Sequence, residues 1–362
     1  MPNSRALMLA GAALAFVLST APASAQTCNV SGDFNDSHLH LTNYVQEGIT
    51  PQRLLELMGD RVPRSTLFGI PLQEQWSYRM SGDFAPRYYL ESNADLYYYS
   101  FTDAAIAMGY RSLRPEQQAR LDPMITGFNP ADMYAADHIR RVLTTFPGVF
   151  TGIGEFSVNK EFVTSNIAGD SPSLFDPALD RIFDFAAEAG LVVIFHNDIV
   201  MPFPRAEQER IFFNAARDEL AEHPGATIIW AHMGLGRVVA PPTQFMTFLE
   251  EILGDLRTAH VYFDISWEEA AKYVLRDRDS VHAFASLINR YPDRFLFGTD
   301  VAAPDSATKY YALYERYRPL WRELTPEASA NVRLCNYQRL FDAARTHVRA
   351  WEARNAPARP RG

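Results

Sequence analysis

The order of strand-like and helix-like segments is the feature that most constrains the fold of this chain. Eight short runs rich in β-branched and aromatic residues alternate with longer segments in which apolar residues recur at helical spacing. The predicted strands are 33–40, 65–70, 123–128, 149–156, 191–195, 226–231, 260–266 and 294–298, and the clearest helical segments are 174–189, 205–222, 244–253 and 280–291. Such alternation indicates parallel βαβ units, and eight of them fit one closed (β/α)8 TIM barrel.

A long aromatic-rich segment interrupts this alternation after the second predicted strand. Residues 72–110 include Trp76, Tyr78 and the run Tyr97-Tyr98-Tyr99. In a barrel the loops that follow strands build the active-site face, so we expect this insertion at the mouth. Its aromatic residues fit two interpretations equally well, a lid or wall of a substrate site and a satellite helix packed on the barrel.

The two ends of the chain are predicted to lie outside the barrel domain, which we place at residues 26–350. Residues 1–25 contain Arg5, an apolar run and Ala23-Ser24-Ala25, the pattern of a cleaved secretory signal peptide. The apolar run is short for a membrane span, so an uncleaved anchor is the weaker alternative. We therefore expect a periplasmic or secreted protein without stable membrane insertion, ending in a flexible tail at residues 351–362.

Charge and cysteine content limit the partners of the mature chain. Removal of residues 1–25 takes away one positive charge and leaves 33 basic and 43 acidic residues, a formal net charge of −10. Such a surface argues against nucleic acid as a partner and leaves small molecules as the expected ligands. The two cysteines, Cys28 and Cys335, either form a disulfide in an oxidising compartment or remain as a free thiol and a buried apolar residue. The sequence carries no signal for oligomeric state.

Candidate metal ligands stand at the ends of the predicted strands. His38 and His40 are two residues apart at the end of the first strand, so their side chains point to the same face. Later strands end at or just before Glu155, His196, His232 and Asp300. The carboxyl ends of barrel strands meet at one mouth, where imidazoles and carboxylates from different strands can hold a divalent ion and leave a position open.

The motifs around these residues resemble the amidohydrolase superfamily, and in particular its amidohydrolase-related (amidohydrolase 2) branch. The resemblance spans about residues 33–345 and rests on five short segments: Asp36-Ser37-His38-Leu39-His40, Gly154-Glu155-Phe156, Phe195-His196-Asn197, Ala231-His232-Met233-Gly234 and Phe297-Gly298-Thr299-Asp300. It implies that His38, His40 and His196 bind metal and that Asp300 binds metal or accepts a proton from water. In relatives that hold one ion, the residue matching His232 is a general acid or base.

The number of ions depends on Glu155. In two-metal relatives a glutamate at this position bridges both ions, whereas the branch often holds one ion and leaves His232 free for proton transfer. The chain departs from members with a carbamylated lysine, because Lys160 lies five residues beyond Glu155. We expect one divalent ion, with zinc as the expected metal and two ions as the alternative.

The resemblance implies hydrolysis of an amide, ester or lactone bond in a small molecule by metal-activated water. The same branch contains nonoxidative decarboxylases, which are the alternative, although export argues against a catabolic decarboxylase. A noncatalytic metal- or ligand-binding barrel is the third interpretation. It is disfavoured because a site without catalytic activity is expected to lose at least one of its metal-binding residues, and this set is complete.

Overall fold

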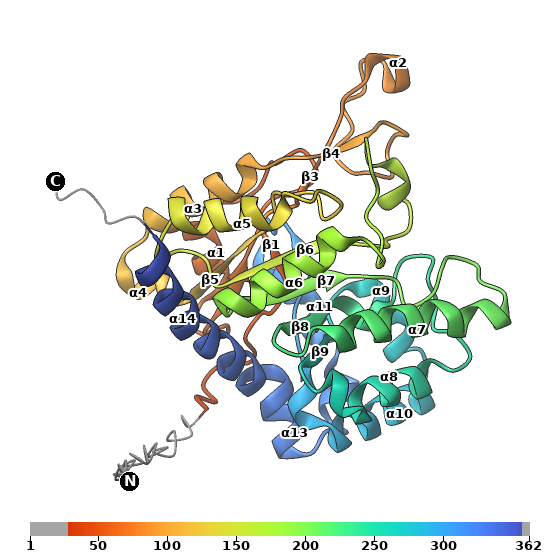
Figure 1. Ribbon diagram of the computed structural model, residues 1–362. Coiled ribbons are helices and arrows are strands. Elements are labelled where there is room, and N and C mark those ends of the chain that lie inside the picture. The colour runs from red at the N-terminus through yellow and green to blue at the C-terminus, as the bar shows by residue number, and fades with distance from the viewer. Residues whose placement is uncertain (1–27, 357–362) are drawn as a thin grey trace, which may run out of the picture.

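A curled parallel sheet forms the centre of the protein (Figure 1). The computed structural model describes residues 28–356. Seven parallel strands pair in the order β10-β9-β8-β7-β6-β5-β2. Their bounds are β2 Ser65–Leu67, β5 Leu121–Ile125, β6 Gly152–Ser157, β7 Val192–His196, β8 Thr227–Trp230, β9 Val261–Asp264 and β10 Phe295–Leu296.

The first strand segment closes this sheet into a barrel. β1 (Leu39–His40) pairs with β11 (Val301–Ala302) and bridges to Phe68 beyond β2. Just before it, Asp36 bridges to Ser65, and the Ser37 amide donates to the Phe297 carbonyl at 3.1 Å. The segment thus lies between β2 and β10, and the predicted (β/α)8 barrel is confirmed.

All of the barrel strands except β7 are shorter than predicted. The first, expected at 33–40, forms a continuous ladder only at Leu39–His40. The residues before it alternate their backbone hydrogen bonds between the two flanking segments, as Asp36 donates to Arg64 and Ser37 donates to Phe297. The eighth, expected at 294–298, ends at Leu296 because the Phe297 amide donates to the Val332 carbonyl.

Helices surround the barrel, and the predicted ones begin and end within three residues of their expected positions. α6 shows why: Asp176 caps its amino end by accepting from the Ala178 amide, Pro177 occupies its first turn, and Gly190 ends it with a positive φ. The longer helices are α1 Pro51–Met58, α3 Phe101–Arg111, α5 Ala135–Thr145, α6 Pro177–Ala189, α7 Ala206–Glu222, α8 Phe245–Gly254, α9 Glu268–Val274, α10 Arg278–Arg290, α11 Ala307–Arg316 and α14 Asn336–Asn355.

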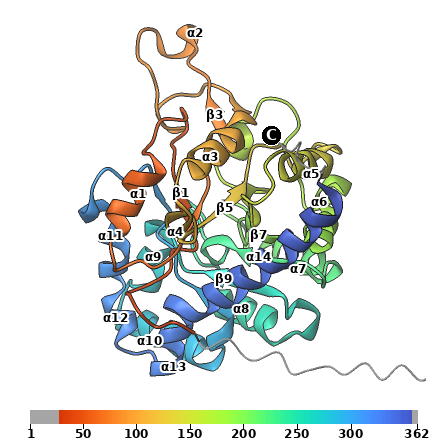
Figure 2. The ribbon, with the colours of Figure 1, turned by 90° about the vertical axis from the view of Figure 1, so that its left-hand side faces the viewer.

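Helix α14 covers the amino end of the barrel (Figure 2). Tyr337 and Phe341 pack with interior residues of the strands, including Ile194 and Ile229. Tyr337 also donates to Asp122 near the start of β5 at 2.8 Å. One end of the barrel is therefore filled by apolar packing, which leaves the carboxyl ends of the strands for a functional site.

The insertion forms an arm that stands out from the barrel (Figures 1 and 2). Its strands β3 (Leu72–Glu74) and β4 (Leu96–Tyr98) pair antiparallel, and the short helix α2 (Tyr78–Ser81) lies near its tip. Tyr89 is buried with Tyr44 at its base, whereas Trp76 and Tyr78 are 56% and 74% exposed. The aromatic residues are thus divided between packing at the base and exposure along the arm.

Both ends of the described chain are fixed to the body of the protein. Cys28 and Cys335 form a disulfide, which decides between the two cysteine states left open by the sequence. The predicted tail start at residue 351 is wrong, because α14 continues to Asn355 and buries Trp351 against Phe185. The proposed signal peptide at 1–25 and residues 357–362 lie outside the described residues. Within residues 28–356, no helix is long and apolar enough to cross a membrane.

Candidate metal centre

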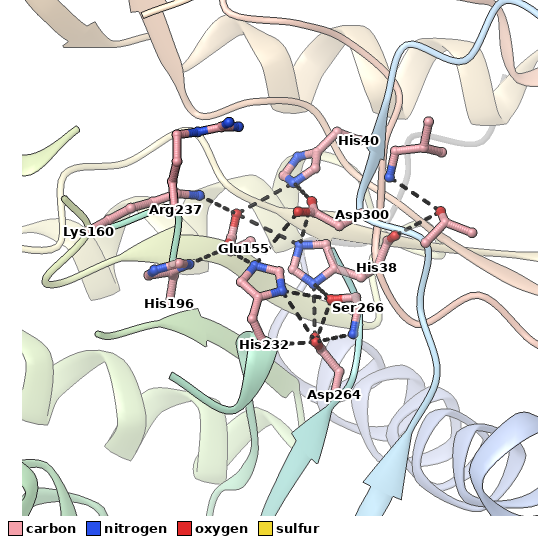
Figure 3. A network of polar contacts seen from close by, with 12 residues as sticks. His38, His40, Glu155, Lys160, His196, His232, Arg237, Asp264, Ser266 and Asp300 are labelled. Atoms are coloured by element: carbon pink, nitrogen blue, oxygen red, sulfur yellow. Dashed lines mark hydrogen bonds and ion pairs between the residues drawn. The ribbon is translucent and has the colours of Figure 1, made fainter. Parts of the chain in front are cut away.

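The six residues singled out in the sequence meet at the carboxyl ends of the strands (Figure 3). His38 and His40 come from the β1 segment, Glu155 from β6 and His196 from the last position of β7. His232 lies in the turn Ala231–Gly234 that follows β8, and Asp300 lies between β10 and β11. All six are buried or nearly so.

Two carboxylates face the four imidazoles at short range. Asp300 Oδ1 lies 3.1 Å from His40 Nε2 and 3.4 Å from His38 Nε2. Glu155 Oε2 lies 3.5 Å from His40 Nε2, and Glu155 Oε1 lies 3.4 Å from His232 Nε2 and 3.1 Å from His196 Nδ1. Ligand atoms of His38, His40 and Asp300 form one group compact enough for a metal ion, and those of His38, Glu155 and His232 form another.

Hydrogen bonds behind the histidines set which ring nitrogen faces this centre. His38 Nδ1 bonds Asp264 Oδ2 at 2.9 Å, and His40 Nδ1 bonds the Gly69 carbonyl at 3.3 Å. Both partners only accept, so each Nδ1 carries the proton and each neutral ring turns a lone pair on Nε2 inward.

His232 reaches the same state through a serine. Ser266 Oγ donates to Asp264, so it accepts from His232 Nδ1 at 2.8 Å. The third ring thus also turns an Nε2 lone pair toward the centre.

His196 is oriented the other way round. Its Nε2 bonds Asp198 Oδ1 at 3.0 Å, and its Nδ1 faces Glu155. When Nε2–H donates to Asp198, the Nδ1 lone pair meets a carboxylate oxygen, a contact that needs a cation or a proton between the two atoms.

The donor set fits a divalent metal ion. With neutral imidazoles, the inward-facing atoms of the four histidines, Glu155 and Asp300 are all acceptors, the chemistry of nitrogen and oxygen ligands for zinc and similar ions. Among the described residues, His38 Nε2 and His232 Nε2 are buried atoms without a hydrogen-bond partner. A buried polar atom without a partner is costly; a bound cation would satisfy His38 Nε2, and either the cation or a proton would satisfy His232 Nε2.

The titration of the site also favours positive charge at its centre. Burial alone would raise the pKa of Glu155, but the nearby charge of Lys160 and hydrogen bonds from the histidines hold it well below its usual range. Burial would lower the pKa of His38, but Asp300 and Asp264 raise it well above its ordinary value, so without a metal the ring holds a second proton at Nε2, and a bound cation takes the place of that proton. The carboxylates therefore stay ionised and attract a cation.

The backbone around the centre is held by Asp36. Its carboxylate accepts from the His38 amide at 3.2 Å and from the Thr299 amide and hydroxyl at 2.8 and 2.7 Å. Asp300 and His232 have φ of 50° and 56°, a region that costs a non-glycine residue about 1–3 kcal/mol and is typical of functional sites. These contacts place the first and eighth strand ends in one fixed arrangement.

The family of the chain follows from its sequence match to a family model described as Amidohydrolase, over residues 36–342. This protein belongs to the amidohydrolase family. The match covers every residue of the centre, and the resemblance drawn from the short motifs is confirmed. Members of this family are metal-dependent enzymes that act on small molecules, and the geometry above is the candidate metal centre of such an enzyme. No curated protein matches the sequence.

Solved structures share the amidohydrolase fold at low sequence identity. A putative 2-pyrone-4,6-dicarboxylic acid hydrolase from Pseudomonas putida is 14% identical, with a TM-score of 0.50 over 87% of this chain and 98% of that one. A probable enzyme of the same name from Acinetobacter baumannii, with citric acid bound, is 9% identical, with a TM-score of 0.52 over 86% and 99%. An uncharacterized TIM-barrel protein from Bordetella bronchiseptica is 14% identical, with a TM-score of 0.51 over 86% and 99%. At these identities the likeness shows the fold alone.

Several residues of the site were not identified from the sequence. Asp264 ends β9, so the rule that selected the other strand-end carboxylates would have found it. Ser266 and Asp198 follow strand ends by two residues and bond to site histidines. Lys160, set aside as a carbamylated ligand, lies 3.6 Å from Glu155 as a free ammonium group.

Proposed function

We propose that the protein is a metal-dependent hydrolase that cleaves an amide, ester or lactone bond of a small molecule. The observation that carries the proposal is the convergence of inward-facing acceptor atoms from His38, His40, His196, His232, Glu155 and Asp300 on one centre. Neutral imidazoles and carboxylates cannot satisfy one another, whereas a divalent ion held by five of these residues, with a proton to share at His232, would satisfy them together.

Each residue has a proposed role. His38, His40 and Asp300 hold the ion, and Glu155 and His196 are further ligands. A divalent ion such as zinc would supply Lewis acidity, which lowers the pKa of water and polarises a carbonyl group. Asp300 Oδ2, which lies 3.8 Å from His232 Nε2, is placed to accept a proton from water. His232, whose Nδ1–H is held by Ser266, would take this proton from Asp300 at Nε2 and then give it to the leaving group.

One ion is the proposed number. Two compact ligand groups consist of centre residues alone, His38 with His40 and Asp300 and His38 with Glu155 and His232, and both use His38; a third, His196 with Glu161 and Asp198, lies beside them. Its Nδ1 is held by Asp264, so only Nε2 is available, and one lone pair serves one ion at a time.

The proposed location is the periplasm or the medium, after cleavage of a signal peptide at residues 1–25. The disulfide between Cys28 and Cys335 supports this location, because disulfides persist in oxidising compartments.

The test is a substrate panel on the purified chain, with a lactone, an ester and an amide of matched size and a hydroxybenzoate to detect decarboxylation. We expect hydrolysis that is lost with a chelator and restored by one equivalent of a divalent metal. Release of carbon dioxide from the hydroxybenzoate without hydrolysis of any other compound would contradict the proposed reaction. Arg290→Met, which removes a surface charge far from the centre, is the matched control and should keep wild-type turnover.

A further inference from the structure

A cavity of 600 Å³ opens beside Asp300. Tyr88 from the arm, Arg237 from the loop after β8 and Trp267 from the loop after β9 line it. Its lining also includes two more basic residues, Lys309 and Arg316, and the acidic residue Glu268. Of the six residues of the centre, Asp300 is the one in this lining, and on that contact we take the cavity as the approach of a small molecule to the candidate metal centre. Its walls present both charge and flat rings.

Arg237 is held in place but keeps donors to spare. Its Nη1 lies 2.8 Å from Glu269 Oε1, and its Nη2 donates to the Tyr88 hydroxyl at 3.0 Å. Its Nε is buried and has no hydrogen-bond partner within residues 28–356. A guanidinium group has five N–H donors in a planar fork, so it can bind a carboxylate without giving up these two contacts.

Charges of both signs surround Arg237. Glu269 pairs with Lys272 as well as with Arg237, so one carboxylate faces two cations. Lys160 adds a nearly buried ammonium group, 10% exposed, which in the described part of the chain pairs with Glu155 but makes no hydrogen bond. Glu161 is a further carboxylate beside Arg237, since it accepts from the Arg237 backbone amide, so a ligand would be recognised by the spare guanidinium N–H groups and not by a surplus of positive charge.

Aromatic rings border both cations. Lys160 Nζ and the Arg237 guanidinium carbon lie 5.4 and 5.9 Å from the centre of the Trp267 ring. The Tyr88 ring lies 6.0 Å from the same guanidinium carbon. Figure 3 shows Lys160 pointing toward Glu155 and Arg237 on the side of the site opposite Asp264. Flat aromatic walls favour a flat ligand, because planar rings stack on them with little loss of conformational freedom.

We propose that Arg237 binds the carboxylate of a substrate that carries a planar ring, and that Trp267 and Tyr88 contact that ring while the scissile bond lies at the metal centre. This proposal assigns a substrate class to the proposed hydrolase. It rests on the proposed function in one respect, namely that this cavity is the substrate site. It also gives the arm a role, since Tyr88 holds the guanidinium in place from outside the barrel.

The test compares benzoate with benzamide, which have nearly the same shape and differ by one charge. Binding is measured by calorimetry on metal-loaded and on chelator-treated protein, so that coordination of benzoate to a metal is separated from binding to Arg237. We expect benzoate to bind at least tenfold more tightly than benzamide in both forms, since hydrogen bonds to charged groups are the strong ones. Arg237→Met should remove most of this preference.

Two variants control the result. Lys309→Met removes a positive charge from the exposed rim of the same cavity and should change benzoate affinity less than threefold. Arg237→Lys keeps a charge opposite Glu269, so it preserves folding if Arg237→Met does not, and it should lose affinity in part because the forked donors are gone. Equal binding of benzoate and benzamide, or equal losses in Arg237→Met and Lys309→Met, would overturn the proposal.

The outcomes separate this inference from the proposed function. Arg237-dependent benzoate binding by a protein that hydrolyses nothing in the panel would refute hydrolysis and support the carboxylate site. Hydrolysis with equal kcat/KM for carboxylated and neutral aromatic lactones would support the hydrolase and overturn the carboxylate site.

Discussion

Asp264→Asn is expected to weaken metal binding without unfolding the barrel. Asp264 is fully buried, and its Oδ1 accepts from the backbone amides of His232 and Ser266 at 2.9 and 3.1 Å. The asparagine oxygen must take this position, since an amide group there would face two donors. The asparagine NH2 then faces His38 Nδ1 and moves the imidazole proton to Nε2, which removes the lone pair that faces the metal.

The size of the effect follows from that contact. Loss of a partner that orients a metal-binding histidine typically lowers affinity 10- to 100-fold, or about 1.4 to 2.7 kcal/mol. Loss of a charge-assisted hydrogen bond should lower the free energy of unfolding by about 1.5–3 kcal/mol. Chelator competition measures the affinity, calorimetry measures stability, and nitrogen NMR of the imidazoles reports the tautomer.

The matched control is Asp103→Asn. Asp103 is a buried aspartate that accepts from the Thr126 and Gly127 amides at 2.8 and 3.0 Å and contacts no site histidine. We expect it to lose stability and keep metal affinity. Wild-type metal affinity in Asp264→Asn, with His38 still protonated at Nδ1, would refute the reasoning.

Three further predictions concern other parts of the molecule. His232→Asn should keep one metal ion and lose turnover, because His232 is proposed to transfer a proton; binding of two ions by the native protein, with one lost in this variant, contradicts it. Cys28→Ser should lower the free energy of unfolding by on the order of 5 kcal/mol in the chain-entropy model, since the disulfide closes a loop of 307 residues. Denaturant unfolding of the oxidised and the reduced protein measures this value. Two alkylatable thiols in the native protein would show that no disulfide forms. Trp351→Ala should destabilise the protein by about 3–5 kcal/mol, because the indole is 2% exposed in α14; a loss under 1 kcal/mol would restore the idea of a flexible tail at this position.

Much of the fold was predictable because it depends on periodic patterns. Apolar runs gave all eight barrel strands, and caps such as Asp176 and Gly190 gave helix ends to within a few residues. Strand lengths were less predictable, because the ends of β1 and β10 are set by bonds to residues far away in sequence, such as Val332. The tail was misjudged because Trp351 is buried by tertiary packing against α6, which the polar residues around it conceal.

The site was predictable where residue type and strand position coincide. The six residues at strand ends meet as expected, because parallel barrel strands bring their carboxyl ends to one mouth. The residues that orient them were missed for a different reason. Asp198 and Ser266 act through hydrogen bonds to His196 and His232, and a polar residue two positions beyond a strand end has no pattern that separates it from ordinary loop polarity.

The most direct test of the account is the metal content of the purified chain and of two variants. Elemental analysis should find one divalent ion per native chain and little metal in His38→Ala or His40→Ala, whose far-ultraviolet circular dichroism should match that of the native protein because the apolar core lies below the mouth. Native metal content in both variants, or a native chain that binds no divalent ion, would contradict the proposed metal centre.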